Sequence, residues 1–303
     1  MPDELNCTGL VIQAQSGFFT VASEQGTFVC GLRGKLKRGK AEGDLVALGD
    51  RVQIQVQPDG SGVIEAVQPR TRAIVRLDPR PRGVYRQVLL ANADQAVFVF
   101  ACAHPVPRLR MLDRFLVVAE KQGVPPLIVA NKADLVPRER AQELFAPYEP
   151  AGYTVLYTSV NTGAGVMELA ARLAGKISVL AGPSGVGKSS LLNAIQPGLG
   201  IAVKDIGVVN KGQHTTVVRQ LYPLGNGAYV ADTPGWRSLA LWDTEPEEMD
   251  GYFPEIRPLV SQCRFNNCSH TREPGCAVRA AVDAGRLHPE RYESYVRLRL
   301  GKD

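Results

Sequence analysis

The chain has 303 residues, a hydrophobic fraction of 45%, a charged fraction of 21% and a formal net charge of +5. This length suits two or three domains, and the composition excludes a disordered or collagen-like chain. No apolar run is long enough to span a bilayer, and the first residues lack the basic and apolar regions of a signal peptide. We therefore expect a cytoplasmic protein without membrane contact.

Residues 1–68 are predicted to form an all-β domain. Short segments rich in β-branched and aromatic residues alternate there with glycine-containing turns, and they occupy residues 10–15, 18–23, 26–32, 50–57 and 62–68. Five strands within this length favour a small barrel of the oligonucleotide-binding (OB) type.

A basic stretch follows the third of these segments. Five of the eight residues from 33 to 40 are basic, namely Arg33, Lys35, Lys37, Arg38 and Lys40. Such a run is typical of contact with nucleic-acid phosphates, but it also suits a solvated loop that contacts nothing. We predict an RNA-binding loop at one end of the barrel and keep the solvated loop as the alternative.

Residues 69–92 begin with a stretch rich in Pro and Arg, which predicts a linker leading into the next domain. Residues 93–240 alternate between apolar strand-like segments and amphipathic helix-like segments, as expected of a three-layer α/β domain. Strands are expected at 96–102, 126–130, 154–159, 177–182, 220–224 and 228–232, and helices at 111–123, 166–175 and 188–195. Residues 241–303 are predicted to form a helical domain, with helices at 277–285 and 289–300.

A complete phosphate-binding loop (P-loop) lies between a predicted strand and a predicted helix. Gly182 is followed by four residues and then by Gly187, Lys188 and Ser189. The glycines let successive backbone N–H groups face the phosphates, Lys188 reaches the outer phosphates, and the Ser189 hydroxyl can ligate Mg²⁺. The residues expected to bind nucleotide here are Gly182, Pro183, Ser184, Gly185, Val186, Gly187, Lys188, Ser189 and Ser190.

A second nucleotide motif, Asn131-Lys132-Ala133-Asp134, follows the strand predicted at 126–130. It has the Asn-Lys-x-Asp pattern with which GTPases recognise guanine. The Asp134 carboxylate can accept hydrogen bonds from the ring N–H and the exocyclic amine of guanine, a pair of donors that adenine lacks. Ser159 and Val160, at the end of a later strand, resemble the short motif that closes over the base.

Two further segments complete the predicted site. Residues 232–235 resemble the Asp-x-x-Gly motif, in which Asp232 contacts Mg²⁺ and the Gly235 N–H contacts the outer phosphate. Upstream, Thr216 is the first choice and Thr215 the second for a switch threonine that completes the Mg²⁺ shell. The predicted Mg²⁺ ligands are therefore Ser189, Thr216 and Asp232.

The C-terminal domain contains a cluster of metal-ligand residues, namely Cys263, Cys268, His270 and Cys276. Three thiolates and one imidazole suit tetrahedral Zn²⁺, and four protein ligands leave no open position for catalysis. We predict one structural Zn²⁺ per chain. The alternative is a set of buried apolar cysteines beside a surface histidine, and the polar sequence around the cluster argues against it.

The order of the nucleotide motifs is unusual, because Asn-Lys-x-Asp precedes the P-loop instead of following it. This order indicates a circular permutation, which is possible because domain termini often lie close together. With the β-rich N-terminal domain and the C-terminal cysteine cluster, the chain resembles the ribosome small subunit-dependent GTPase A family, RsgA, over essentially its whole length. The resemblance implies a GTPase that is stimulated by the small (30S) ribosomal subunit, binds 16S rRNA and acts in late subunit maturation.

The resemblance also bears on how GTP would be hydrolysed. Trp236 occupies the position of the glutamine that orients the attacking water in many GTPases, and the family is similar in having a hydrophobic residue there. His214, in the expected switch segment, is the candidate for that role, because a neutral imidazole can accept a proton from water or orient it. A histidine bonded within its own loop is the alternative.

Two other functions remain open at this point. A nucleic-acid-binding protein with a passive GTP-sensing site would bind GTP without turnover, and Trp236 gives this reading some support. A P-loop ATPase is the other, and Asp134 argues against it. For the favoured GTPase we expect a monomer that binds Mg²⁺ with GTP. Because the Asp-x-x-Gly segment leads into the cysteine cluster, loss of the outer phosphate would be coupled to reorientation of the C-terminal domain.

Overall fold

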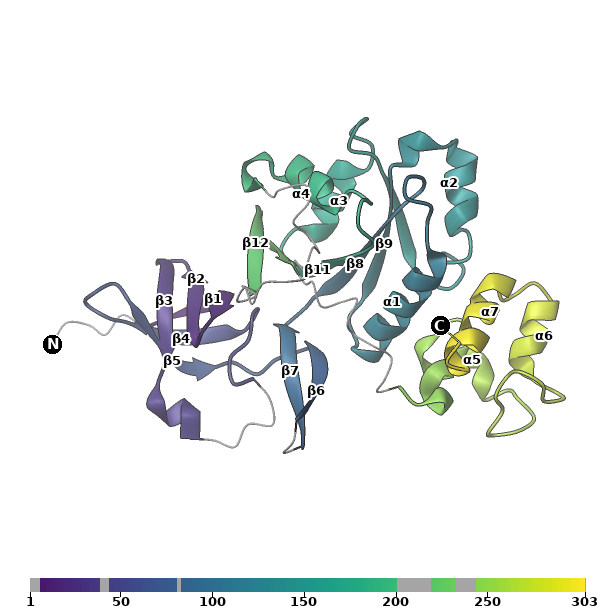
Figure 1. Ribbon diagram of the computed structural model, residues 1–303, viewed down its shortest axis with the longest axis horizontal. Coiled ribbons are helices and arrows are strands. Elements are labelled where there is room, and N and C mark those ends of the chain that lie inside the picture. Colours follow the sequence, from purple (N-terminus) through teal and green to yellow (C-terminus); the bar gives the residue numbers. More distant parts are fainter. Residues whose placement is uncertain (1–5, 39–43, 81–82, 201–218, 233–243, 303) are drawn as a thin grey trace. The chain divides into compact units, whose positions relative to one another are not determined.

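The computed structural model describes residues 6–38, 44–80, 83–200, 219–232 and 244–302 (Figure 1). It divides into two compact units, each assembled from three segments of the chain. The first comprises Met1–Gln95, Leu173–Leu180 and Gln196–Gly235, and the second comprises Ala96–Arg172, Ala181–Ile195 and Trp236–Asp303. Among the described residues, no helix is long and apolar enough to cross a membrane.

Five strands near the N-terminus form a closed barrel. They are β1 (Asn6–Gln15), β2 (Phe18–Ser23), β3 (Gly26–Leu32), β4 (Arg51–Val56) and β5 (Gly62–Val67). They are ordered β1-β2-β3-β5-β4, and pairing of β1 with β4 closes the ring. Alternate residues such as Val11, Val21, Ile54 and Ile64 fill the interior. The five predicted strands and the OB-like barrel are confirmed.

The segment 69–92 is not the plain linker that its composition predicts. It contains strands β6 (Ala73–Arg80) and β7 (Gly83–Ala91), which pair with each other as an antiparallel two-stranded sheet. Both strands of such a sheet are edges, where proline is tolerated. Pro79 therefore sits within β6, although Pro and Arg together suggested irregular backbone.

The first unit contains three more strands, and two of them directly precede nucleotide motifs in the sequence. They are β11 (Ile177–Ala181), β12 (Arg219–Gly225) and β13 (Ala228–Asp232). Strand β13 pairs with β11 in parallel and with β12 in antiparallel orientation. In the register of β11 and β13, Asp232 lies opposite Leu180, two residues before the P-loop begins at Gly182.

The second unit contains the parallel strands β8 (Gln95–Ala101), β9 (Pro126–Asn131) and β10 (Thr154–Thr158), with β9 in the centre. Its helices in this region are α1 (Leu109–Lys121), α2 (Arg138–Phe145), α3 (Val166–Leu173) and α4 (Lys188–Ile195). Helix α2 was not predicted, because only Ala141 and Phe145 of its eight residues are buried. The side chain of Phe115 on α1 packs against Phe98 and Phe100 of β8.

The C-terminal region is helical, as predicted. It comprises η6 (Pro246–Tyr252), α5 (Arg257–Val260), α6 (Ala277–Asp283) and α7 (Pro289–Arg299). Its core includes Phe253, Ile256, Val278 and Tyr295, and the same cluster contains Val117 of α1. The C-terminal helices therefore share a hydrophobic core with the helix that precedes β9.

Candidate nucleotide-binding site and metal centre

The P-loop connects β11 to α4 as predicted, and its first glycine is required by the backbone. Gly182 has φ +152°, and a Cβ atom there would lie 2.1 Å from the carbonyl oxygen of Val99. The Lys188 side chain is only 7% exposed, and its Nζ donates to the carbonyl oxygens of Gly182 at 2.9 Å and Pro183 at 2.7 Å. The loop thus holds its ammonium group at the start of α4, where backbone N–H groups favour an anion.

The Asn-Lys-x-Asp motif lies directly against this loop. Asn131 Nδ2 donates to the carbonyl oxygen of Val186 at 2.8 Å, and Lys132 Nζ donates to that of Gly185 at 2.7 Å. Asn131 Oδ1 in turn accepts from Thr158 Oγ1 at 2.9 Å. Two motifs in reversed sequence order therefore meet in one place within the second unit.

Gly187 shows how tightly the two motifs fit. Its φ is +95°, a value that L side chains rarely adopt, and a Cβ atom there would lie 2.5 Å from Asn131 Nδ2. Asn131 is buried and bonded on both sides, so its amide cannot move aside without losing a bond. Glycine at position 187 is therefore needed for Asn131 to keep its place against the loop.

The Asp134 carboxylate is exposed and supported by the segment after β10. Hydrogen bonds from Ser159 first, and then from Asn161, lower the pKa of Asp134, so it is a carboxylate at neutral pH. Asn161 Nδ2 donates to Asp134 Oδ2 at 3.1 Å. A carboxylate has about four acceptor positions, so Asp134 retains capacity for the two donors of guanine. Ser159 is buried next to the half-buried Val160.

Asn161 is the residue of this site that sequence reasoning missed. The segment that resembles the base-closing motif ends at Val160, and an asparagine in a turn next to Thr162 and Gly163 carries no signal for ligand binding by itself. Its contact with Asp134 depends on two loops that are 27 residues apart in sequence.

The remaining predicted nucleotide residues are only partly described. Ser189 is buried at the start of α4, and Ser190 beside it is half-buried. Asp232 ends β13, as predicted for the Asp-x-x-Gly motif. His214, Thr215, Thr216 and Gly235 lie outside the described residues.

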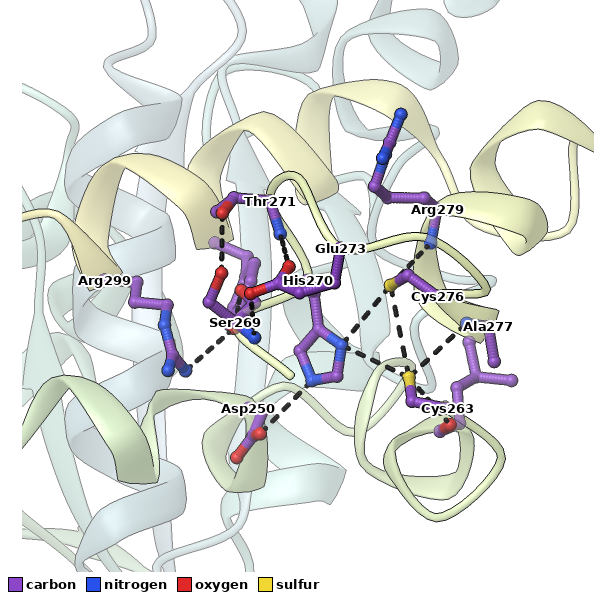
Figure 2. A network of polar contacts seen from close by, with 12 residues as sticks. Asp250, Cys263, Ser269, His270, Thr271, Glu273, Cys276, Ala277, Arg279 and Arg299 are labelled. Atoms are coloured by element: carbon purple, nitrogen blue, oxygen red, sulfur yellow. Dashed lines mark hydrogen bonds and ion pairs between the residues drawn. The ribbon is translucent and has the colours of Figure 1, made fainter. Parts of the chain in front are cut away.

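The four predicted metal ligands converge in the C-terminal region, and Figure 2 shows three of them, Cys263, His270 and Cys276. Their ligand atoms all lie within 4.8 Å of one another. His270 Nδ1 lies 3.5 Å from the Sγ atoms of both Cys263 and Cys276, and these two sulfurs are 4.0 Å apart. A tetrahedral zinc ion has Zn–N bonds of about 2.0–2.1 Å and Zn–S bonds of about 2.3 Å. These bond lengths place a ligand nitrogen roughly 3.6 Å from a ligand sulfur, and two ligand sulfurs roughly 3.8 Å apart. The spacing fits a tetrahedral ion of zinc's size.

The surrounding contacts fix the orientation of the ligands. His270 Nε2 lies 3.3 Å from Asp250 Oδ2, so the carboxylate favours the tautomer that leaves Nδ1 for a metal (Figure 2). Glu273 accepts from the backbone N–H of Ser269 at 2.9 Å and of Thr271 at 3.2 Å. The hydrogen bond from the Ser269 side chain first, and then that from the Ser269 backbone N–H, hold the pKa of the Glu273 carboxyl well below its usual range.

The basic stretch is less free than its sequence suggests. Arg33 Nη1 donates to Glu65 Oε1, and Lys35 Nζ lies 3.4 Å from Glu65 Oε2. Lys37 and Arg38 are in the short helix η1 (Gly34–Arg38), whose last side chains are not described, and Lys40 lies outside the described residues. Among the described side chains, Arg33 and Lys35 therefore line the barrel surface and share one carboxylate.

Comparison with known families matches both main regions of the chain. Residues 67–242 match the RsgA GTPase family, and residues 8–64 match the RsgA N-terminal domain. A protein of Gemmatimonas aurantiaca named small ribosomal subunit biogenesis GTPase RsgA is 50% identical over 299 residues, which cover 96% of each chain. A protein of the same name from Moorella thermoacetica is 42% identical over 289 residues, covering 95% of this chain and 94% of that one.

Two solved structures have the same fold over nearly the whole chain. The crystal structure of YjeQ from Thermotoga maritima superposes with a TM-score of 0.80 at 38% identity, covering 98% of this chain and 99% of that one. The structure of YloQ, described as a circularly permuted GTPase, gives a TM-score of 0.78 at 32% identity and covers 100% and 97% of the two chains. The reversed motif order in this chain agrees with that description.

Proposed function

The chain belongs to the RsgA GTPase family and is a GTP hydrolase, and from this premise we propose that it acts in biogenesis of the small ribosomal subunit. Relatives that match along the full length carry that function in their names. We infer that the small subunit with its 16S rRNA is the partner and that binding to it stimulates hydrolysis. We also infer a cytoplasmic monomer, and a second sedimenting species at micromolar concentration would contradict the monomer.

One observation supports the assignment of GTP most directly. Asn131 and Lys132 donate hydrogen bonds to the carbonyl oxygens of Val186 and Gly185, so the guanine motif is fixed against the phosphate loop. A single nucleotide can then contact Lys188 with its phosphates and Asp134 with its base. Adenine would leave the Asp134 carboxylate without its two donors, which favours GTP over ATP.

The chemistry requires little covalent participation from the protein. The P-loop backbone and Lys188 position the phosphates and stabilise the charge that develops on them. Mg²⁺ accompanies GTP, and the oxygen ligands that the chain can offer it are the Ser189 hydroxyl, the Asp232 carboxylate and the Thr216 hydroxyl. We infer that His214 orients the attacking water, since Trp236 has no acceptor for it.

We expect slow turnover by the free protein and at least about tenfold faster turnover with purified small subunits. A partner that completes the catalytic site of a GTPase, as an activating protein does with an arginine finger, can accelerate hydrolysis by roughly 10³–10⁵. The assay measures phosphate release at saturating GTP and Mg²⁺ over a salt series. The variant His214→Ala should bind GTP normally but lose most of the stimulation.

Large ribosomal subunits are the matched control, because they present similar RNA charge without the specific partner. Equal stimulation by large and small subunits would point to nonspecific RNA binding, whose affinity falls steeply with salt. No turnover with either subunit would favour the passive GTP sensor. Wild-type rates in His214→Ala would remove His214 from the mechanism.

We further propose that Cys263, Cys268, His270 and Cys276 hold one structural Zn²⁺ per chain. The donor set and the tetrahedral spacing support this choice, and the surrounding polar loop lacks a core of its own. Purified protein should contain about one zinc per chain, and Cys276→Ser should lose most of it together with thermal stability. Cys7→Ser, in the barrel, is the control and should keep its zinc. A folded wild-type protein with far less than one zinc would contradict the site.

A further inference from the structure

A polar pocket lies on the outer surface of the barrel. Its volume is about 450 Å³, within the range of roughly 300–1,000 Å³ that is typical of small-ligand sites. Seven residues line it, and one of them is Cys7. The other six carry polar or charged side chains that form hydrogen bonds, namely Asn6, Thr8, Arg33, Gln53, Gln55 and Glu65. We call this feature the barrel pocket.

The register of the strands builds the barrel pocket. Across β1 and β4, Asn6 pairs with Gln55 and Thr8 pairs with Gln53. Because side chains alternate along a strand and Ile54 points into the core, these four side chains share the outer face. The pairing of β4 with β5 shifts register between Gln53 and Ile54, and this irregularity leaves Glu65 as the extra residue of β5. Such bulges re-aim side chains, and Glu65 lines the pocket.

The charges of the pocket are balanced and held in place. Glu65 accepts from Arg33 Nη1 and lies 3.4 Å from Lys35 Nζ, and these contacts lower the pKa of its carboxyl, the bond from Arg33 most. Arg33 Nη1 also lies 3.4 Å from Gln55 Oε1. These contacts hold one end of the Arg33 guanidinium at one wall of the pocket. Lys35, whose side chain is 66% exposed, stands beside the pocket with its charge accessible to solvent.

We propose that the barrel pocket binds one unpaired nucleotide of RNA and reads its base. Gln53, Gln55 and Asn6 each offer a donor and an acceptor on one amide, which is the arrangement that pairs with the edge of a base. Bases in single-stranded RNA are free to turn outward and to stack on a guanidinium plane, which Arg33 supplies. Lys35 contacts the adjoining phosphate.

The chemistry of the pocket disfavours simpler ligands. A bare anion would meet the Glu65 carboxylate, and an apolar group would bury amides without partners. The pocket lies on β1, β4 and β5, whereas OB-type barrels bind oligonucleotides mainly on the face of strands 2 and 3. It is therefore an additional contact. The identity of the RNA as rRNA rests on the proposed function, but the base-reading chemistry does not.

The test uses the full-length protein and fluorescent eight-nucleotide single strands of A, U or C, with binding followed by anisotropy over a salt series. Wild-type protein should prefer one base composition by roughly tenfold, as expected when amides read a base edge. In the double variant Gln53→Leu with Gln55→Leu, the ratio of affinities for the different strands should fall close to one, and the dependence of affinity on salt should stay the same. Lys35→Ala should instead weaken all three strands equally and reduce the salt slope by about one.

Gln15→Leu, an exposed glutamine of β1 outside the pocket, is the matched control and should behave as wild type. Equal unfolding midpoints of all variants confirm that the barrel is intact. A wild-type protein without base preference, or a preference that survives in the double variant, would overturn the proposal. Free mononucleotides that bind as tightly as the strands would assign the pocket to a small metabolite instead of RNA. Stimulation of the wild-type GTPase activity by small subunits is a separate measurement. Its absence would contradict the proposed function but not the binding of a base in the barrel pocket.

Discussion

Replacement of Arg291 by methionine is expected to lower the free energy of unfolding by about 3–5 kcal/mol, the cost of breaking a buried ion pair from one side. Arg291, on α7, is 1% exposed. Its Nη1 donates to Asp113 Oδ1 at 2.6 Å and its Nε donates to Glu255 Oε1 at 2.7 Å. Methionine keeps most of the apolar stem but leaves two nearly buried carboxylates without their cation. Urea unfolding measures the loss.

The aromatic rings around Arg291 add to the expected cost. Its guanidinium carbon lies 4.7 Å from the ring centroid of Phe253, 5.5 Å from that of Tyr148 and 5.6 Å from that of Tyr153. A cation over an aromatic face is worth about 2 kcal/mol or more when it is removed from water. Arg291→Lys should therefore recover only part of the stability, since an ammonium cannot donate in the planar fork that serves both carboxylates.

Arg286→Met is the matched control, because Arg286 is an exposed arginine in the same helical region. It should change stability by no more than about 0.5 kcal/mol. The double variant Asp113→Asn with Arg291→Met should lose less than the sum of the single losses, because the two residues share one interaction. A loss for Arg291→Met as small as that of the control would show that the ion pair contributes little.

The same contacts constrain how the C-terminal region can move. Asp113 and Val117 belong to α1, whereas Glu255 and Arg291 belong to the C-terminal region. A rotation of that region away from α1 would have to separate buried charges and open a shared hydrophobic core. If hydrolysis reorients the metal-binding region, as the sequence suggested, α1 must therefore move with it. Helix α1 precedes β9, and the guanine motif begins at the end of β9.

The sequence predicted the parts of the fold whose signals are local. The barrel strands are short segments rich in β-branched and aromatic residues between glycine-containing turns, so they are visible without the structure. The P-loop and the Asn131–Asp134 motif were found because spacing carries their chemistry. The cluster of Cys263, Cys268, His270 and Cys276 is visible in the sequence for the same reason, since cysteine and histidine at short intervals are typical of a metal site.

Other parts depend on contacts that no local pattern encodes. Strands β6 and β7 stabilise each other, and their Pro and Arg content obscured the pairing. Asn161 acquires its role only where its loop meets Asp134. Arg291 has the composition of a surface residue, and its burial follows from carboxylates 36 and 178 positions away in sequence. Arginine is rarely fully buried unless it is paired, so the structure was needed to identify it.

Gly187→Ala should weaken GTP binding by roughly 30-fold to a few thousand-fold. The backbone there has φ +95°, which costs an L side chain about 1–2 kcal/mol. The new Cβ would also lie 2.5 Å from Asn131 Nδ2 and displace that amide from Val186, which leaves a buried donor unpaired at about 1–3 kcal/mol. Without nucleotide, the loop of the variant can relax and so avoid both costs. Binding of GTP forces the loop back into its native conformation, so both costs reduce the affinity, by a factor of ten for about every 1.4 kcal/mol.

Gly185→Ala separates the two contributions. Its φ of +79° carries the same backbone cost, but the nearest atom to a new Cβ is Pro105 Cδ at 3.8 Å, an ordinary contact. This variant should therefore lose only about 5- to 30-fold, the effect of the backbone alone. The affinities of both variants for a fluorescent, non-hydrolysable GTP analogue are measured, and the difference between their losses is the part that depends on Asn131.

A third variant tests whether that difference has the stated cause. Combined with Asn131→Ala, the Gly187→Ala substitution has no amide to displace, so its own further effect should shrink to that of Gly185→Ala. Equal losses for Gly187→Ala in the presence and absence of the Asn131 side chain would mean that the two motifs do not constrain each other. If the effect does shrink, the glycine that shapes the phosphate loop also sets the position of the motif that reads the base, although the chain reaches that motif first.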